Sequence, residues 1–438
     1  MTTRSTLAIS GISALLLTAA LGGCAGTEFS STLPGFGAPE TRATDSAAAE
    51  ASAHYLTIAD TGIDVGVFGE NLAAAVAEQN TDAYGVESRV IDTPAGDETA
   101  DLSSTAPDYL AAEEAADAAD GFDEVLDSGA ASDFTEQEQN LDLTEAAIAA
   151  DDIEVDRVVV AVDDISSEGV SATEVEVSVD LYVARELNTG VVWEEVIAHV
   201  ATVDASGEIV AYEVQDDFWY AQEGVYNPAD ETEPGNLSPE ELSGEDTEED
   251  LTSAEIESSG EASTALYGKE DLAVQTVLNS TQRAKVVAYA NKYWNNYNPA
   301  YIPSEQDCTN FISQALFAGG WTKVTGLYNT DGAWWYTGNA LLPKSYAWAT
   351  AQNFYNFAVK ESKRSKVHAS VYDLLPGQVL QYDVTATGMN HTMVVTKVVD
   401  GAPYLTYHTS DNHNKPFSAV AVAVRVHDTT PRWFPLSV

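Results

Sequence analysis

Cysteine is almost absent from this chain of 438 residues, which contains only Cys24 and Cys308. A disulfide-stapled scaffold needs several cysteine pairs, so that class of small secreted domain is excluded. Burial of apolar side chains must hold the fold instead, and the chain is long enough for it. Each of the two thiols therefore needs its own explanation.

Basic residues are also scarce, with 19 Lys and Arg against 70 Asp and Glu and a formal net charge of -51. Residues 1–268 hold 5 of the basic and 59 of the acidic residues, whereas residues 269–438 are close to neutral. So much negative charge argues against nucleic acid as a partner. We also expect two parts of such different charge to have separate cores.

The N-terminus explains one of the thiols. Arg4 precedes a short apolar run, Leu7–Leu21, which ends in small residues directly before Cys24. This pattern resembles the signal peptide of a bacterial lipoprotein, and a membrane span would need about 20 continuous apolar residues. The resemblance implies cleavage before Cys24, a lipid on its sulfur, a signal peptide at 1–23 and a location at the outer face of the cell membrane. Residues 24–50, rich in Gly, Ser, Thr, Pro and Ala, are expected to form a tether.

The middle of the chain changes its pattern twice. Residues 51–150 are acidic and rich in Ala, and we expect them to be partly helical, for example at 110–119 and 141–150, or disordered. Residues 151–222 alternate apolar and polar side chains, which predicts a small α+β domain with about four antiparallel strands. Residues 223–268 are acidic and interrupted by proline, as is typical of a linker.

Residues 269–438 begin with two predicted helices. The stretch AVQTVLNSTQRAKVVAYANKYWN has helical spacing of its apolar residues, and Asn298-Pro299 ends it. A second helix ends at Gly319-Gly320 and carries an apolar stripe, made of Phe311, Ile312, Ala315 and Leu316. This region therefore predicts a domain with its own helical layer.

The second helix starts at Cys308, directly after Asp307. We expect Asp307 to cap the helix by accepting a hydrogen bond from the backbone N–H of Thr309 or Asn310. Cys308 then occupies the polar, solvent-facing helix start, where the helix dipole stabilises a thiolate. This position favours a nucleophile over a cysteine that merely packs in the core.

A thiolate nucleophile needs a base and a residue that orients the base. His391 opens the predicted strand HTMVVTKVV, which Asp400-Gly401 turns back into PYLTYHTSDN. A two-residue loop places His408 on the same sheet face as His391, diagonal to it. An odd loop would bring Asp411 to that face, and a four-residue loop Asn412, so both remain alternatives.

The order of these residues has a counterpart in a known family. Residues 276–438 resemble the putative amidase domain family of bacterial exported proteins, a branch of the papain-like cysteine hydrolases near the NlpC and CHAP groups. The matching stretches are RAKVVAYANKYWNNYNPAY, DCTNFISQALFAGGW, SYAWAT, LLPGQVLQY, NHTMVVTKV and YLTYHTSDN. The resemblance implies an α+β fold in which the helix that bears the cysteine packs on an antiparallel sheet.

The resemblance also implies roles for single residues. Carried over by position, it makes Cys308 the nucleophile, His391 the general base and acid, and His408 the third polar residue. Related domains often have Asp after the Pro-Gly that opens the strand, and this chain has Gln378 there. Because that position is usually structural, the assignment of the three residues is retained.

The mechanism needs two oxyanion donors. The backbone N–H of Cys308 is one, and Gln306, Tyr297 and Tyr301, just upstream, are the candidates for the second. We find no metal-ligand cluster and expect neither metal nor cofactor.

Together these observations predict a monomeric, lipid-anchored cysteine amidase or peptidase outside the membrane. We expect it to hydrolyse amide bonds of cell-wall peptides, in the stem peptides or cross-links of peptidoglycan. The substrate rests on location and family analogy alone. Two alternatives remain, a non-catalytic binding or scaffold lipoprotein of the cell envelope and an amidase for small N-acyl compounds.

Overall fold

The computed structural model describes residues 55–91, 132–222, 277–304, 306–339, 342–384, 388–425 and 431–438. The predictions for the signal peptide, Cys24, the tether, the helical patch at 110–119 and the linker at 223–268 lie outside these residues. No helix within them is long and apolar enough to cross a membrane.

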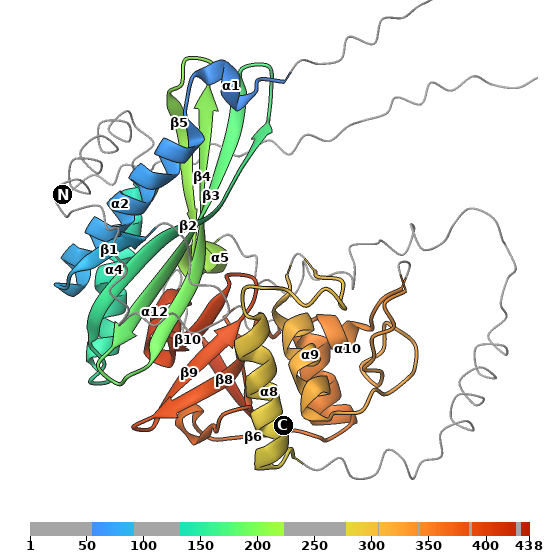
Figure 1. Cartoon of the computed structure of the whole chain (residues 1–438). Coiled ribbons are helices and arrows are strands. Elements are labelled where there is room, and N and C mark those ends of the chain that lie inside the picture. Colours follow the sequence, from blue (N-terminus) through green and yellow to red (C-terminus); the bar gives the residue numbers. More distant parts are fainter. Residues whose placement is uncertain are drawn as a thin grey trace, which may run out of the picture. The chain divides into compact units, whose positions relative to one another are not determined.

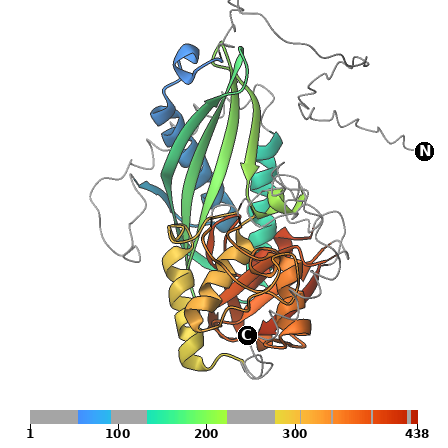
Figure 2. The same ribbon diagram turned by 90° about the vertical axis from the view of Figure 1, so that its right-hand side faces the viewer.

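Within the described residues, eleven strands form one sheet, and most neighbouring strands are antiparallel (Figures 1 and 2). The strand order is β1-β2-β3-β4-β10-β9-β8-β7-β11-β6, and β5 also pairs with β4. The strands are β1 (Ser88–Ile91), β2 (Val155–Gly169), β3 (Glu174–Leu187), β4 (Val192–Asp204), β5 (Ile209–Gln215), β6 (Lys366–Val367), β7 (Val379–Asp383), β8 (His391–Val399), β9 (Ala402–Tyr407), β10 (Asn412–Pro416) and β11 (Arg432–Ser437).

The helices lie in both halves of the described chain. Those of the N-terminal half are α1 (Ile58–Thr61), α2 (Val65–Tyr84), α4 (Ser132–Ala149) and α5 (Asp217–Gln222). Those of the C-terminal half are α8 (Ser280–Tyr293), α9 (Cys308–Gly319), α10 (Tyr346–Ala349), α11 (Ala351–Tyr355), η1 (Asn356–Glu361), η2 (Val371–Asp373) and α12 (Phe417–Ala423).

The four strands predicted between residues 151 and 222 are confirmed as β2 to β5. Burial along β4 alternates residue by residue, because period-two side chains point to opposite faces of the sheet. Its buried apolar residues share one hydrophobic core with the apolar faces of α2 and α4, which include Leu72, Val76 and Ile148. The α+β class expected from the sequence is therefore observed.

The expectation that the acidic and neutral parts have separate cores is met only in part, because one hydrophobic core lies wholly within residues 278–438 but the sheet is shared. Strand β10 pairs with β4 through Asn412 opposite Glu195 and His413 opposite Glu194, so one sheet runs through both parts. Tyr404 belongs to the same hydrophobic core as β2 to β5. The net charge of each part did not predict this pairing, because carboxylates of the acidic part bind side chains of the neutral part at the junction. Glu195 binds Lys415, and Glu194 binds His413.

The two helices predicted near the cysteine are confirmed, but the first is shorter than predicted and ends at Tyr293, before Asn298-Pro299. Helix α8 starts only at Ser280, where Asn279 and Gln282 form a reciprocal capping box. Helix α9 starts at Cys308 as predicted, and Gly320 ends it in the left-handed conformation with φ 109°. The apolar stripe of α9 is buried with Val286 and Ala290 of α8.

Helices α8 and α9 approach each other closely at Gly319. A Cβ atom added there would lie 2.4 Å from Val286 Cγ2, so no larger side chain fits without movement. We expect Gly319→Ala to lower the free energy of unfolding by about 1–3 kcal/mol through overpacking. Gly332→Ala is the control, because nothing lies within 4 Å of an added Cβ there. Denaturant titration measures both, and equal stabilities would contradict the close packing.

Candidate functional site

Cys308 is the first residue of α9, but it does not face solvent as the sequence suggested. Its exposed fraction is 1%, because the start of α9 packs against the start of β8. The hydroxyls of Thr309 and Thr392 are 2.8 Å apart across this contact, and Cys308 Sγ lies 3.6 Å from Thr309 Oγ1. The thiol therefore lies at the helix N-terminus but inside the protein.

Asp307 stands at the N-cap position, yet its side chain does not cap the helix. Its backbone oxygen accepts from Phe311 N at 2.9 Å, but the carboxylate accepts from Ser304 N at 2.8 Å and Asn310 Nδ2 at 2.7 Å. The predicted bonds from the N–H groups of Thr309 or Asn310 are absent. Asp307 has helical backbone angles, φ -86° and ψ -1°, rather than the extended angles of a side-chain cap.

The other carboxylate oxygen of Asp307 binds His408. His408 Nδ1 lies 2.8 Å from Asp307 Oδ2, and His408 Nε2 lies 2.7 Å from Tyr293 O. Two acceptors require two ring protons, so His408 is an imidazolium. Burial alone would lower its pKa, but the hydrogen bond that His408 donates to Asp307 and the charges of Asp411 and Asp307 raise the pKa above its ordinary value. The His408 ring stacks on Phe311 with ring centres 3.8 Å apart.

The prediction that His391 and His408 share a sheet face is wrong. The loop between β8 and β9 has two residues as predicted, since Val399 pairs with Ala402. A β-bulge between Val395 and Lys397 then shifts the register by one residue. A shift of one residue moves every following side chain to the opposite face. His408 thus lies on the α9 face, and it cannot orient His391 as proposed from the sequence.

His391 lies on the opposite face among aromatic rings. It pairs with Tyr382 of the neighbouring strand β7, and the two ring centres lie 5.6 Å apart. The Tyr407 ring meets the His391 ring edge-on, with ring centres 5.1 Å apart. Burial lowers the pKa of His391 to about 3, and the charge of Asp217 acts in the opposite direction. Burial raises the pKa of Tyr382, and the charges of Asp217 and Cys308 add to it. Cys308 therefore lies within electrostatic range of Tyr382, the strand partner of His391.

The alternative orienting residues have other partners. Asp411 Oδ1 accepts from Tyr297 Oη at 3.0 Å, and burial raises the pKa of Asp411 to about 6. Asn412 Nδ2 donates to Ser410 O at 2.9 Å, while its backbone pairs β10 with β4 and β9. Both residues thus help to hold the strand junction.

Two of the three oxyanion candidates are held by other contacts. Tyr297 donates to Asp411 and stacks on His408, with ring centres 4.1 Å apart. Tyr301 packs against the Tyr336 ring at 4.7 Å. Gln306 lies in the loop before Cys308, and within the described residues its Oε1 is buried without a hydrogen-bond partner.

Sequence reasoning missed a buried carboxylate on the His391 face. Asp217, the first residue of α5, accepts from Tyr407 Oη at 2.6 Å and Lys415 Nζ at 2.6 Å, and from Ser410 Oγ. Burial would raise the pKa of Asp217, but the charge of Lys415 and these hydrogen bonds lower it, so it is ionised. An acidic pair directly after a strand, in EVQDDFWYA, was the available signal.

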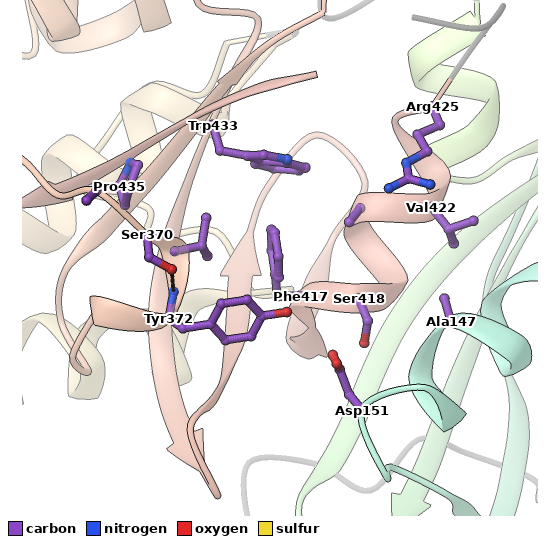
Figure 3. Close-up of a pocket in the computed structure, with 13 residues that line it drawn as sticks. Ala147, Asp151, Ser370, Tyr372, Phe417, Ser418, Val422, Arg425, Trp433 and Pro435 are labelled. Atoms are coloured by element: carbon purple, nitrogen blue, oxygen red, sulfur yellow. Dashed lines mark hydrogen bonds between the residues drawn. The ribbon is translucent and has the colours of Figure 1, made fainter. Parts of the chain in front are cut away.

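A cavity of about 570 Å³ opens on the same face, between α4, η2, α12 and β11 (Figure 3). Tyr372, Phe417 and Trp433 form its aromatic wall, and Asp151 and Arg425 add charge of both signs. The Trp433 ring lies 5.5 Å from Tyr382, which separates the cavity from His391. Among the described residues, no group of three or more His, Cys, Asp or Glu side chains could hold a metal ion.

Comparison with known proteins gives matches that cover only part of the chain. The uncharacterized protein YhbB of Bacillus subtilis (strain 168) is 36% identical over 140 residues, which are 31% of this chain and 44% of that protein. The match thus spans less than half of the relative's length. No solved structure gave a significant match. A family model described as "Putative amidase domain" matches residues 280–429, the C-terminal region of the chain.

Proposed function

We propose that the chain is a cysteine-dependent amidase or peptidase with a papain-like C-terminal domain. The family match indicates amidase-type hydrolysis for residues 280–429. The cysteine mechanism is supported by the contact of Thr309 with Thr392, which joins the helix that begins with Cys308 to the strand that begins with His391, and by the electrostatic effect of Cys308 on Tyr382, whose ring packs on His391. A thiol at a helix N-terminus is stabilised as thiolate by the helix dipole.

In the proposed reaction, His391 accepts the thiol proton and the Cys308 sulfur attacks the amide carbonyl carbon. The new C–S bond leaves a tetrahedral oxyanion, which the backbone N–H of Cys308 and an amide N–H of Gln306 stabilise. His391 then gives its proton to the leaving nitrogen as the C–N bond breaks. Water loses a proton to His391, attacks the thioester and releases the acid and the thiol.

The Asp307–His408 pair has a different role from the one that the family resemblance implied. It joins the residue before Cys308 to the end of β9 through a buried, charge-assisted hydrogen bond. We infer that the pair holds the nucleophile helix at a fixed height on the sheet. This role explains two charged residues at the site without requiring either to touch the substrate.

Access to the site is narrow, since Cys308 and His391 are each 1% exposed. A substrate reaches the sulfur only through local opening of the residues that cover it. We propose that the substrate is an amide of a cell-wall peptide, and that a lipid at Cys24 holds the protein at the outer face of the membrane. The Cys24 motif and the family resemblance support this location.

The test uses the full chain, a thiol-directed electrophile and two kinds of amide. We expect mass spectrometry to locate the label on Cys308, and incubation with cell-wall sacculi to release new amino groups. Soluble N-acyl amino acids distinguish wall cleavage from action on small amides. Absence of both labelling and amine release would exclude catalysis and favour a binding or scaffold protein.

A further inference from the structure

A buried chain of charged groups joins the N-terminal sheet to the amidase region. Arg185 donates to Glu195 Oε1 at 2.5 Å, and Lys415 Nζ lies 3.3 Å from Glu195 Oε2 and 2.6 Å from Asp217 Oδ2. Arg185 Nε also donates to Asn80 of α2 at 3.1 Å. All of these side chains are buried, so water screens their charges little.

Asp217 lies at the end of this series of charged groups that is nearest to His391. Its position in α5 is outside residues 280–429, and yet its oxygens accept from three residues of that region, Tyr407, Ser410 and Lys415. Tyr407 is the residue whose ring meets the His391 ring edge-on. One carboxylate thus fixes the hydroxyl end of a ring that packs on the proposed base.

The same carboxylate provides a negative charge for the His391 face. The ionisable groups there are Tyr382 from β7, Tyr407 from β9, Asp217 from α5 with its partner Lys415 from β10 and, acting through Tyr382, Cys308 from α9. Asp217 is the carboxylate among them, and a negative charge favours the imidazolium that forms when His391 takes the thiol proton. Neutral tyrosines do not provide this charge.

We infer that Asp217 is a positioning residue for His391, supplied by the N-terminal sheet region, so that the functional site is complete only with residues outside the amidase-matched segment. This inference rests on the proposed cysteine mechanism. It means that the N-terminal sheet region helps to position the proposed base, and does not act only as a spacer.

If the buried charged groups had only a structural role, a different result would be expected. A variant of Glu195 distinguishes this structural role from the positioning role of Asp217. Glu195→Gln removes a carboxylate from the same Lys415 ammonium and also weakens the bond from Arg185. The electrostatic neighbour of His391 is Asp217, however, not Glu195. Both Asp217→Asn and Glu195→Gln should destabilise the protein, but only Asp217→Asn should alter the Cys308–His391 equilibrium.

The experiment follows the ultraviolet absorbance of thiolate against pH in the full chain, with the Cys308→Ser variant subtracted. This readout requires neither substrate nor access to the sulfur. In the unchanged chain we expect thiolate well below the ordinary thiol pKa of about 8.5. In Asp217→Asn the pH midpoint of thiolate formation at Cys308 should rise by about one pH unit, because loss of the negative charge disfavours the His391 imidazolium. Glu195→Gln should leave this midpoint unchanged.

Equal shifts in both variants, or no shift in Asp217→Asn, would overturn the inference and leave the cysteine mechanism intact. A chain whose Cys308 titrates as an ordinary thiol would overturn both. If Asp217→Asn does not fold, the double variant Asp217→Asn with Lys415→Met removes both buried charges together, which is often tolerated. Compared with Lys415→Met alone, its midpoint of thiolate formation should rise, because this comparison removes only the carboxylate, and the absence of that rise would equally overturn the inference.

Discussion

Replacement of Cys308 by alanine is expected to lower kcat/KM for amide hydrolysis by at least about a thousandfold, because the acyl-enzyme can no longer form. The change removes one sulfur atom from a buried site, so the loss of stability should be small beside the loss of turnover. Amine release from sacculi measures the turnover, and thermal unfolding checks the fold. Normal turnover in a folded Cys308→Ala protein would contradict the mechanism.

His391→Gln should cause a loss of similar size, and the chain offers a matched control for it. His199 is likewise fully buried in a strand, binds Tyr212 Oη through Nδ1 at 2.6 Å, and has its pKa lowered by burial to about 3. His199→Gln therefore makes the same chemical change in a similar environment within the N-terminal sheet. If both variants lose turnover equally, the effect belongs to folding rather than to a base at His391.

Replacement of Asp307 by asparagine should lower the free energy of unfolding by about 3–5 kcal/mol at acidic pH, because it leaves the His408 imidazolium buried without its counter-ion. His408 has a raised pKa in the folded protein, so the pair's stabilisation is fully present below the unfolded pKa of about 6.5. It is lost as the pH rises through the folded pKa. The variant should therefore differ most from the unchanged chain below about pH 6.5 and least at alkaline pH.

Denaturant titration at several pH values measures this difference. A double-mutant cycle with His408→Gln isolates the pair, since the two changes together should cost less than the sum of each alone. A difference that stays constant with pH would contradict a charged His408. Strictly additive changes would contradict the direct contact between Asp307 and His408.

The local elements of this fold could be predicted from the sequence, but their relative placement could not. The start of α9 at Cys308, its end at Gly320 and the two-residue turn at Asp400-Gly401 all follow from local signals, and each is confirmed. The sheet face on which His408 lies depends on a β-bulge after Val395, and no local sequence pattern predicts that bulge.

The burial of Cys308 and the position of Asp217 depend on contacts between segments far apart in the chain. Cys308 lies at a polar helix end, and only the packing of α9 on β8 removes it from solvent. Asp217 reaches the His391 face because β10 pairs with β4, and the charge split along the sequence argued against that pairing. These features are set by tertiary structure, whereas periodicity and turn signals report local structure only.

The pairing of β4 with β10 has a consequence for how the chain reaches its fold. Strands β2 to β5 are consecutive and can pair early, but the edge of β4 at Glu194 and Glu195 stays open until β10 forms much later in the chain. Open edges invite aggregation, and charged side chains discourage it. The two glutamates thus protect the unfinished edge, and His413 and Lys415 then bring the partners that these carboxylates bind.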